Sequence, residues 1–351
     1  MKNYYFLALM SLGLLYASCS KDNHDQSSNL ASKEKVELVT LKSGVVVEKR
    51  GNQYLIGGDV VLSEAQFKSL EETGDMFPKK ELKPVSIGEQ NEESIQFKNV
   101  GVYPTPYNLW AMVRYTLSPN LTAYTKQTIT EAINHWEANT NVRFYNATGQ
   151  PTIDPTYGFA YPYVEFTQST VNNSFVGRVG GKQILNLAQW QPAYVAIHEI
   201  GHAIGLYHEM SRPDRDNFVN VNISNVPTGN QHNFDKKTTN YSYIGAFDFS
   251  SIMMYGAFDF AINSSVPVIT KKDGTTSGIG NATGLSFNDR LWPNSYYVPY
   301  IARSDVYAEL APVVYKPDNT VMTAQERLNL QAQLNNGNPN PPNCCRIPNV
   351  H

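Results

Sequence analysis

The chain has 351 residues, a formal net charge of −3 and 12% aromatic residues. Its length exceeds that of one typical domain, so we expect two or three structural units. No run of lysine or arginine stands out, which argues against a partner that is a nucleic acid or an anionic membrane surface. Twenty-two tyrosines, with many asparagine, serine and threonine residues, suit an exported protein.

The N-terminus has the pattern of an export signal. Lys2 precedes an apolar run at residues 4–16, which is too short to span a bilayer as a helix. The run ends in Ala17-Ser18-Cys19, which is similar to a bacterial lipoprotein cleavage box and predicts lipidation of Cys19 and an outer-membrane tether. The alternative is an ordinary signal peptide that contains a cysteine. We expect a signal at residues 1–19 and a flexible polar tether at residues 20–32.

Residues 33–100 are charged and alternate in polarity, and we expect them to form a small separate unit. Ser63 and Gln66 form a capping-box pattern at the start of a helix predicted over residues 63–73. Gly57-Gly58-Asp59 reads as a turn. Short strands are predicted at residues 36–41, 45–47, 54–56 and 60–62. An acidic linker at residues 89–93 is a site where a protease could cut.

The pattern changes near residue 103. A long amphipathic helix is predicted over residues 122–140, because Ile129, Ile133 and Trp136 have helical spacing. Strands are predicted at 109–117, 142–145 and 163–166, and residues 174–176 and 183–187 are expected to form a hairpin before a helix that starts near residue 192. This order predicts an α+β domain with a twisted mixed sheet and two long helices. A further helix is predicted at 323–334.

The most informative stretch is residues 198–208, which read H-E-x-x-H-x-x-G-x-x-H. On a helix, His198 and His202 lie on one face and can reach a single ion. Gly205 can adopt a positive φ, so the chain can turn and bring His208 to the same ion. Three imidazoles leave one open position, which is typical of a catalytic zinc, and Glu199 lies beside it as a candidate base. The alternative is a core helix with a few hydrogen-bonded histidines.

The motif continues as E-M-S-R-P-D-R-D-N-F-V at residues 209–219, and S-I-M-M-Y-G follows at residues 251–256. Together with the glycine-rich segments 176–178 and 180–183, they closely resemble the astacin family of metzincin zinc endopeptidases. The resemblance covers about residues 104–297. It implies a zincin-like catalytic domain at residues 101–298, with one catalytic Zn²⁺ ion, an N-terminal subdomain that holds the sheet and helices, and an irregular C-terminal subdomain. It also implies protein or peptide substrates.

The resemblance assigns roles to single residues. It makes His198, His202 and His208 the zinc ligands and Glu199 the general base. Met253 then matches the methionine that forms an apolar floor beneath the metal. Tyr255 matches a tyrosine that ligates zinc at rest and later supports the oxyanion. For Met253 and Tyr255 taken alone, ordinary core packing is the alternative.

The resemblance also implies activation by processing. Glu209 matches a glutamate that pairs through water with the new N-terminus of the mature enzyme. We therefore expect an activating protease to cut between about residues 94 and 107, and residues 33–100 to be a pro-peptide. Residues 56–60, I-G-G-D-V, are similar to the family's inhibitory motif, in which Asp59 would occupy the fourth zinc position. From the residues alone, Asp59 reads as a turn aspartate.

An extended substrate is expected to pair with strand 183–187, which carries Gln183, Leu185 and Leu187. The chain has no cysteine between residues 20 and 343, unlike animal astacins, and this favours a bacterial member. Trp292-Pro293 stands where a continuous C-terminal helix is usual. Residues 299–351, with Cys344 and Cys345, have no role that the sequence indicates.

The main alternative from another class is a surface adhesin or glycan-binding lipoprotein with a vestigial metal site. The many tyrosines and asparagines would suit it. Zinc content and proteolysis of a denatured protein distinguish the two hypotheses.

Overall fold

The computed structural model describes residues 36–76, 98–102, 109–110, 112–153, 160–239, 241–280, 282–297, 323 and 326. The predicted export signal with Cys19, the tether, the linker at 89–93, and Cys344 and Cys345 lie outside these residues. Of the helix predicted at 323–334, Thr323 and Glu326 are described, and their side chains accept hydrogen bonds from each other's backbone N–H, as a capping box requires. Within the described ranges, no helix combines the length and hydropathy that crossing a membrane requires.

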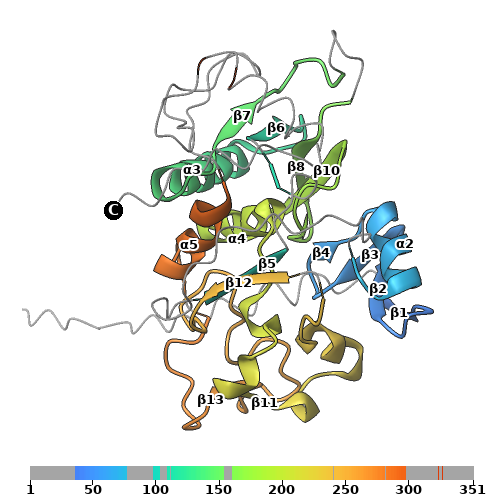
Figure 1. Cartoon of the computed structure of the whole chain (residues 1–351), viewed down its shortest axis with the longest axis vertical. Coiled ribbons are helices and arrows are strands. Elements are labelled where there is room, and N and C mark those ends of the chain that lie inside the picture. Colours follow the sequence, from blue (N-terminus) through green and yellow to red (C-terminus); the bar gives the residue numbers. More distant parts are fainter. Residues whose placement is uncertain are drawn as a thin grey trace, which may run out of the picture.

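Residues 36–76 form a compact unit that we call the N-terminal module (Figure 1, blue). An antiparallel meander of β1 (Val36–Thr40), β2 (Val46–Arg50), β3 (Gln53–Ile56) and β4 (Val60–Val61) is followed by α2 (Glu64–Thr73). Both bonds of the predicted capping box between Ser63 and Gln66 are present, and Gly74 ends the helix with a φ of 74°. The strands and the helix predicted for this unit are therefore confirmed.

The central sheet has the strand order β10 (Lys182–Ala188), β8 (Tyr163–Ser169), β6 (Val113–Leu117), β7 (Phe144–Asn146), and all its neighbours are parallel. Two helices, α3 (Ala123–Asn139) and α4 (Ala193–Ile204), pack against each other beside it. The fully buried Trp136 of α3 donates a hydrogen bond to the carbonyl of Ile197 on α4, at 3.1 Å. The expected α+β architecture is confirmed.

Two predictions for this region are confirmed only in part. The strand predicted at 109–117 begins only at Val113, because the Trp110 indole turns to the end of α4 and donates to the Ala203 carbonyl at 2.8 Å. The predicted hairpin forms only as one antiparallel bridge. Strand β9 (Ser174–Phe175) pairs in parallel with β4 of the N-terminal module, and it meets β10 only through a bridge between Asn173 and Asn186.

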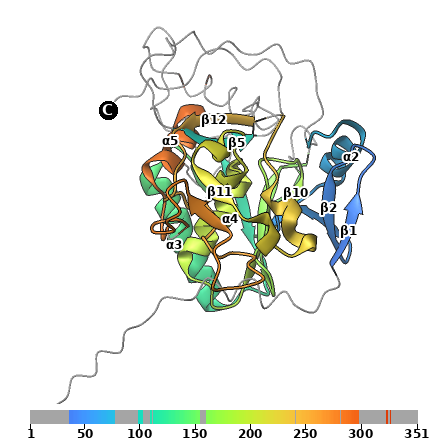
Figure 2. The same ribbon diagram turned by 90° about the horizontal axis from the view of Figure 1, so that it is seen from below.

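The chain beyond α4 is irregular, as expected (Figures 1 and 2); most of residues 209–271 lie on the side of α4 opposite to α3 and β7, whereas residues 285–296 lie beside α3. Strand β11 (Val219–Val221) pairs with β13 (Ile269–Lys271), and β12 (Tyr241–Gly245) pairs with β5 (Lys98–Val102). Short 3₁₀ helices fill the connections: η1 (Glu209–Ser211), η2 (Arg215–Asn217), η3 (Ile223–Asn225) and η4 (Thr228–Phe234).

The last helix, α5 (Phe287–Tyr296), continues through Pro293, so Trp292-Pro293 does not interrupt it. Trp292 is fully buried over two glycines. A Cβ atom added at Gly101 would lie 2.5 Å from the indole, and one added at Gly205 would lie 3.0 Å from it. Trp292 therefore locks α5 and β5 onto the turn at the end of α4.

Candidate metal centre

The turn at the end of α4 brings the third histidine back to the first two. Gly205 has a φ of 119°, and its N–H bonds to the carbonyls of Gly201 and His202. A side chain there would be strained by this backbone conformation and would also crowd Val102 at 3.0 Å. The glycine therefore lets the chain reverse within three residues of the helix and place His208 beside it.

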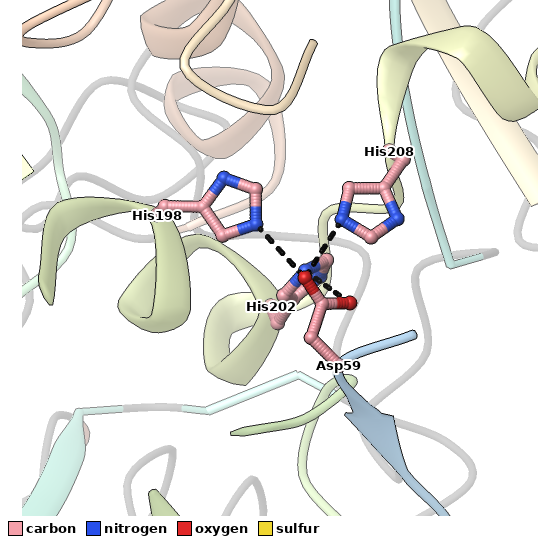
Figure 3. A group of neighbouring side chains, drawn as sticks. All are labelled: Asp59, His198, His202 and His208. Carbon is pink, nitrogen blue, oxygen red and sulfur yellow. Dashed lines mark hydrogen bonds and ion pairs between the residues drawn. The ribbon is translucent and has the colours of Figure 1, made fainter. Parts of the chain in front are cut away.

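Figure 3 shows four side chains facing one point: His198 and His202 from α4, His208 from beyond the turn, and Asp59 from the N-terminal module. The Nε2 atoms of His198 and His208 lie 3.5 and 3.2 Å from Asp59 Oδ2. The Nε2 atom of His202 lies 3.6 Å from Asp59 Oδ1.

The other ring nitrogen of each histidine has a partner that fixes its proton. His198 Nδ1 donates to the Ile252 carbonyl and His202 Nδ1 to the Leu206 carbonyl, both at 2.8 Å. His208 Nδ1 lies 3.1 Å from the Tyr255 hydroxyl, which donates its own proton to the Gly57 carbonyl at 2.6 Å. Because the Nδ1 atoms keep their protons on these partners, it is the Nε2 atoms that face the common point and are left to ligate a metal ion.

These four residues fit a zinc ion. Two ligand atoms that lie roughly 2.0–2.1 Å from zinc in tetrahedral geometry are about 3.4 Å apart, which is close to the separations of 3.2–3.6 Å seen here. Among the described residues, His202 Nε2 and Asp59 Oδ1 are buried atoms without a hydrogen-bond partner. A cation between them would satisfy both atoms, and imidazole with carboxylate is a donor set that suits zinc.

The electrostatics of the cluster follow from burial and from Asp59. Burial lowers the pKa of His202 and lowers that of His208 to about 4, so both rings are neutral at pH 7. Burial also opposes charge on His198, but its hydrogen bond to Asp59 and the charge of Glu199 raise its pKa to about 9. Burial, with the charge of Asp59 next, raises the pKa of Glu199 well above its ordinary value.

Glu199 and Met253 complete the surroundings. Glu199 is 2% exposed, and within the described chain its Oε2 has no hydrogen-bond partner. Met253 lies in the turn at residues 251–256 and packs against α4 so closely that a Cβ atom at Gly201 would be 2.7 Å from its sulfur. The Met253 carbonyl accepts the N–H of Glu209 at 2.9 Å, which ties this turn to the chain just after His208.

Glu209 is buried and does not point into the histidine cluster. Its Oε1 accepts from Arg212 Nη1 at 3.1 Å and from the backbone N–H of Asp248 at 2.9 Å. Arg212 is itself fully buried and also donates to Asp214 and to the Gly245 carbonyl. The segment after the third histidine is therefore held by a buried charge network.

The predicted substrate strand, β10, is the end strand of the central sheet, but the segment that contains β9 lies along its outer side. Gln183, Leu185 and Leu187 are buried, and β10 is covered by β8 on one side and by the Asn173–Asn186 bridge on the other. On the far side of that bridge, β9 pairs with β4 of the N-terminal module. This geometry argues against the three residues as the peptide-binding edge.

The comparisons with known proteins agree with this geometry. The model of the Astacin peptidase family matches residues 103–298. The chain belongs to the astacin family. It is 39% identical over 175 residues to flavastacin of Elizabethkingia meningoseptica, which is 49% of this chain and 36% of that protein. It is 33% identical over 192 residues to blastula protease 10 of Paracentrotus lividus, which is 54% of this chain and 32% of that protein.

A solved structure of high choriolytic enzyme 1, a hatching enzyme zinc-protease from Oryzias latipes, is 28% identical, with a TM-score of 0.46; the match covers 53% of this chain and 92% of that one. The chain thus spans about a third of the length of the curated relatives named above. Astacin membership and the histidine cluster together identify the metal cofactor as zinc.

A further contact between the N-terminal module and the astacin domain (residues 103–298) has no counterpart among the sequence motifs. Glu48 of β2 is 2% exposed. Its Oε1 lies 3.1 Å from His232 Nε2 and accepts from Asn233 Nδ2 at 3.2 Å, and Arg50 also pairs with its carboxylate. No local pattern marks Glu48, because its partners across the contact lie in η4, 184 residues or more away, and no short motif joins them to it.

Proposed function

We propose that this protein is a zinc-dependent endopeptidase made as a zymogen, in which the N-terminal module is the inhibitory pro-segment. The observation that carries the proposal is the convergence of three Nε2 atoms, each on a ring with its Nδ1 fixed, with the Asp59 carboxylate at the fourth corner. Bound zinc would supply an electrophile that activates water and polarises the scissile carbonyl.

The residues of the chain would supply the proton transfers and the charge stabilisation. Glu199 would accept the proton of the attacking water and deliver it to the leaving amine. Its carboxylate is buried, and the Oε2 atom has no hydrogen-bond partner in the described part of the chain, which suits it to that role. Tyr255 would donate its hydroxyl proton to the tetrahedral oxyanion once it is released from the Gly57 carbonyl.

The N-terminal module occupies three places that a substrate would need. Asp59 stands at the fourth metal position, Gly57 holds the Tyr255 hydroxyl, and β4 covers the edge of β9 through the pairs Val60–Ser174 and Val61–Phe175. When the module leaves, β9 can pair with an extended peptide main chain. This mode of binding recognises neither end of the substrate, which favours cleavage at internal bonds.

Activation would need a cut that leaves the astacin domain whole. Strand β5 pairs with β12, and its Val100 and Val102 are buried beneath the turn after α4. A cut by an activating protease on the N-terminal side of Lys98 would remove the module and keep β5 in place. The water-mediated pairing of Glu209 with a new N-terminus stays part of this proposal.

Export is the remaining part of the proposal. The apolar run after Lys2 and the Ala17-Ser18-Cys19 sequence support a secreted or outer-membrane-tethered enzyme, with Cys19 as the lipidated residue. Mass spectrometry of the N-terminus, before and after maturation, tests both the lipid and the cleavage site. The intact histidine cluster and Glu199 weigh against an adhesin with a vestigial site.

Two variants test the catalytic and inhibitory roles separately. Glu199→Ala should retain one zinc per chain yet cleave neither casein nor an internally quenched peptide blocked at both ends; cleavage by this variant would overturn the assignment.

Asp59→Asn should raise the initial activity of the unprocessed chain, whereas Glu64→Gln, an exposed change in the same module, should not. Equal latency in Asp59→Asn and the wild type would refute the inhibitory role.

A further inference from the structure

The buried carboxylate of Asp289 has no role in the chemistry described so far. Asp289 lies in the first turn of α5 and is fully buried. It belongs to a capping box, in which Ser286 N–H donates to its Oδ2 at 2.9 Å and its own N–H donates to Ser286 Oγ at 3.0 Å. Capping uses Oδ2, and the same oxygen also accepts the N–H of Ile252 at 2.8 Å.

The second oxygen of Asp289 starts a chain of hydrogen bonds that ends at a zinc ligand. Ser251 Oγ donates to Asp289 Oδ1 at 2.6 Å. The N–H of Met253 donates to Ser251 Oγ at 3.0 Å. That N–H shares a peptide group with the Ile252 carbonyl, which accepts the proton of His198 Nδ1 at 2.8 Å.

All the donors in this chain point the same way, from the histidine toward the carboxylate. Hydrogen bonds aligned in this manner polarise one another, most strongly when they are buried and end at a charge. Ser251 is 1% exposed and Met253 is 1% exposed, so solvent does not interrupt the chain. In many metal sites the ligating histidine donates its second N–H directly to a carboxylate. Here one peptide group and one hydroxyl lie between the histidine and the carboxylate.

We infer that Asp289 is a positioning residue for zinc, acting on His198 through Ser251 and the Ile252–Met253 peptide group. The inference rests on the zinc ligation of the proposed function, but not on its zymogen or substrate parts. The relay fixes the orientation of the His198 ring and increases the electron density at its Nε2. Within the described residues, the partners of the other two ligands lead to no carboxylate: Leu206 contributes a carbonyl, and Tyr255 passes its proton to Gly57.

A purely structural role would also explain a buried Asp289, because the same bonds staple the turn at residues 251–256 to α5. The two roles differ in what they predict for metal affinity. Loss of a group in the surroundings of a metal ligand weakens metal binding by roughly 10- to 100-fold. Loss of a helix cap lowers stability without changing the histidine ligand.

The test measures the zinc dissociation constant of the full-length chain by chelator competition, together with thermal stability. Asp289→Asn and Ser251→Ala should each weaken zinc binding roughly 10- to 100-fold, and the double variant should be no weaker than the weaker single one. The matched control, Ser286→Ala, removes the cap of the same helix and should lose stability while keeping the zinc affinity of the wild type.

The proton on His198 Nδ1 gives a second readout that does not depend on folding free energy. Its NMR resonance should move upfield in Ser251→Ala, the milder variant, and in Asp289→Asn. Wild-type zinc affinity in both variants, or a loss of affinity in Ser286→Ala as large as theirs, would overturn the inference. A wild-type chain that binds no zinc would instead refute the proposed function itself.

Discussion

The contact between Glu48 and η4 leads to a quantitative prediction about latency. Glu48 is 2% exposed and faces His232, Asn233 and Arg50. Glu48→Ala removes a charged hydrogen bond to Asn233 and the carboxylate that lies 3.1 Å from His232 Nε2. Removing one partner from such a buried cluster costs about 3 kcal/mol. We apply this cost to the docked state of the N-terminal module, because His232 and Asn233 belong to the astacin domain.

A cost of about 3 kcal/mol raises the population of the undocked state roughly 100-fold, since each 1.4 kcal/mol is a factor of ten. The assay is hydrogen exchange at the amide of Ser174, which donates to the Asp59 carbonyl at 3.0 Å in the docked state. Where exchange is limited by the open population, its rate should rise by the same roughly 100-fold factor. The initial peptidase activity of the unprocessed chain should rise in parallel.

Two controls separate docking from the stability of the module itself. Glu37→Ala changes an exposed carboxylate on β1 and should alter neither readout. His232→Ala should reduce the effect of Glu48→Ala, because the two residues share one contact. If Ser174 exchanges at the wild-type rate in Glu48→Ala, or if the effect persists in full in His232→Ala, the argument that Glu48 anchors the module is refuted.

The same contact predicts the direction of a pH effect. Burial raises the pKa of Glu48, but the neighbouring His232 and Arg50 outweigh it and hold the pKa below its ordinary value of 4.5; of these two, His232 is the one gained on docking, because Arg50 lies in the same module. A carboxyl whose pKa is lowered on docking adds stability above its ordinary pKa, and that stability is lost as the pH falls through the lowered value. Ser174 exchange, corrected for its intrinsic rate, should therefore rise on acidification below about 4.5 in the wild type. The rise should be smaller in Glu48→Ala, and an equal rise in both would exclude Glu48 as its source.

Three further changes test the packing around the site. Gly201→Ala should destabilise the chain by about 1–3 kcal/mol in denaturant unfolding, because its Cβ would lie 2.7 Å from the Met253 sulfur. In a Met253→Ala background the same change should be stabilising by up to about 1 kcal/mol, since alanine favours the helix; destabilisation in both backgrounds would place the clash elsewhere. Arg212→Gln should cost about 3–5 kcal/mol, because it removes the guanidinium that pairs with the buried Glu209 carboxylate and leaves only the Asp248 N–H of the two donors described above; a neutral result would show that the network is not stabilising. Removing zinc with a chelator should lower the stability by about 2.7 kcal/mol relative to zinc at 100 times its dissociation constant, and an unchanged melting temperature would contradict zinc binding to the folded state alone.

The parts of the site that the sequence revealed are those set by local geometry. The spacing of His198 and His202 is fixed by the helix, and Gly205 is recognisable because few other residues tolerate its φ of 119°. The capping box at Ser63 and the long helix α3 are also local patterns, and both are predicted correctly. Even so, Asp59 can be assigned a role only through family resemblance, because its contact with His208 joins positions 149 residues apart.

The predictions that were only partly right or wrong concern contacts between residues far apart in the sequence. Residues 174–176 and 183–187 have the alternation of a hairpin, yet β9 takes its partner from β4, more than a hundred positions earlier. The alternation of polar and apolar residues marks a short strand but does not show which strand it pairs with. The strand nearest in the sequence is therefore the expected partner. Trp292 reads as a break in a helix, but its indole covers Gly101 and Gly205, and only the folded chain brings those two glycines together.

The three histidine rings are not held in the same way, and under the proposed function this difference bears on how latency is relieved without loss of the metal. The ring of His198 is oriented by the turn at residues 251–256 and that of His202 by the Leu206 carbonyl, both within the astacin domain. Only His208 has a partner, Tyr255, that is itself bonded to the N-terminal module. Departure of the module therefore removes Asp59 and frees the Tyr255 hydroxyl while two ligands keep their orientation. Under the proposed function, the astacin domain therefore supplies the histidine ligands and orients two of them, and loss of the N-terminal module changes only Asp59 and the surroundings of His208.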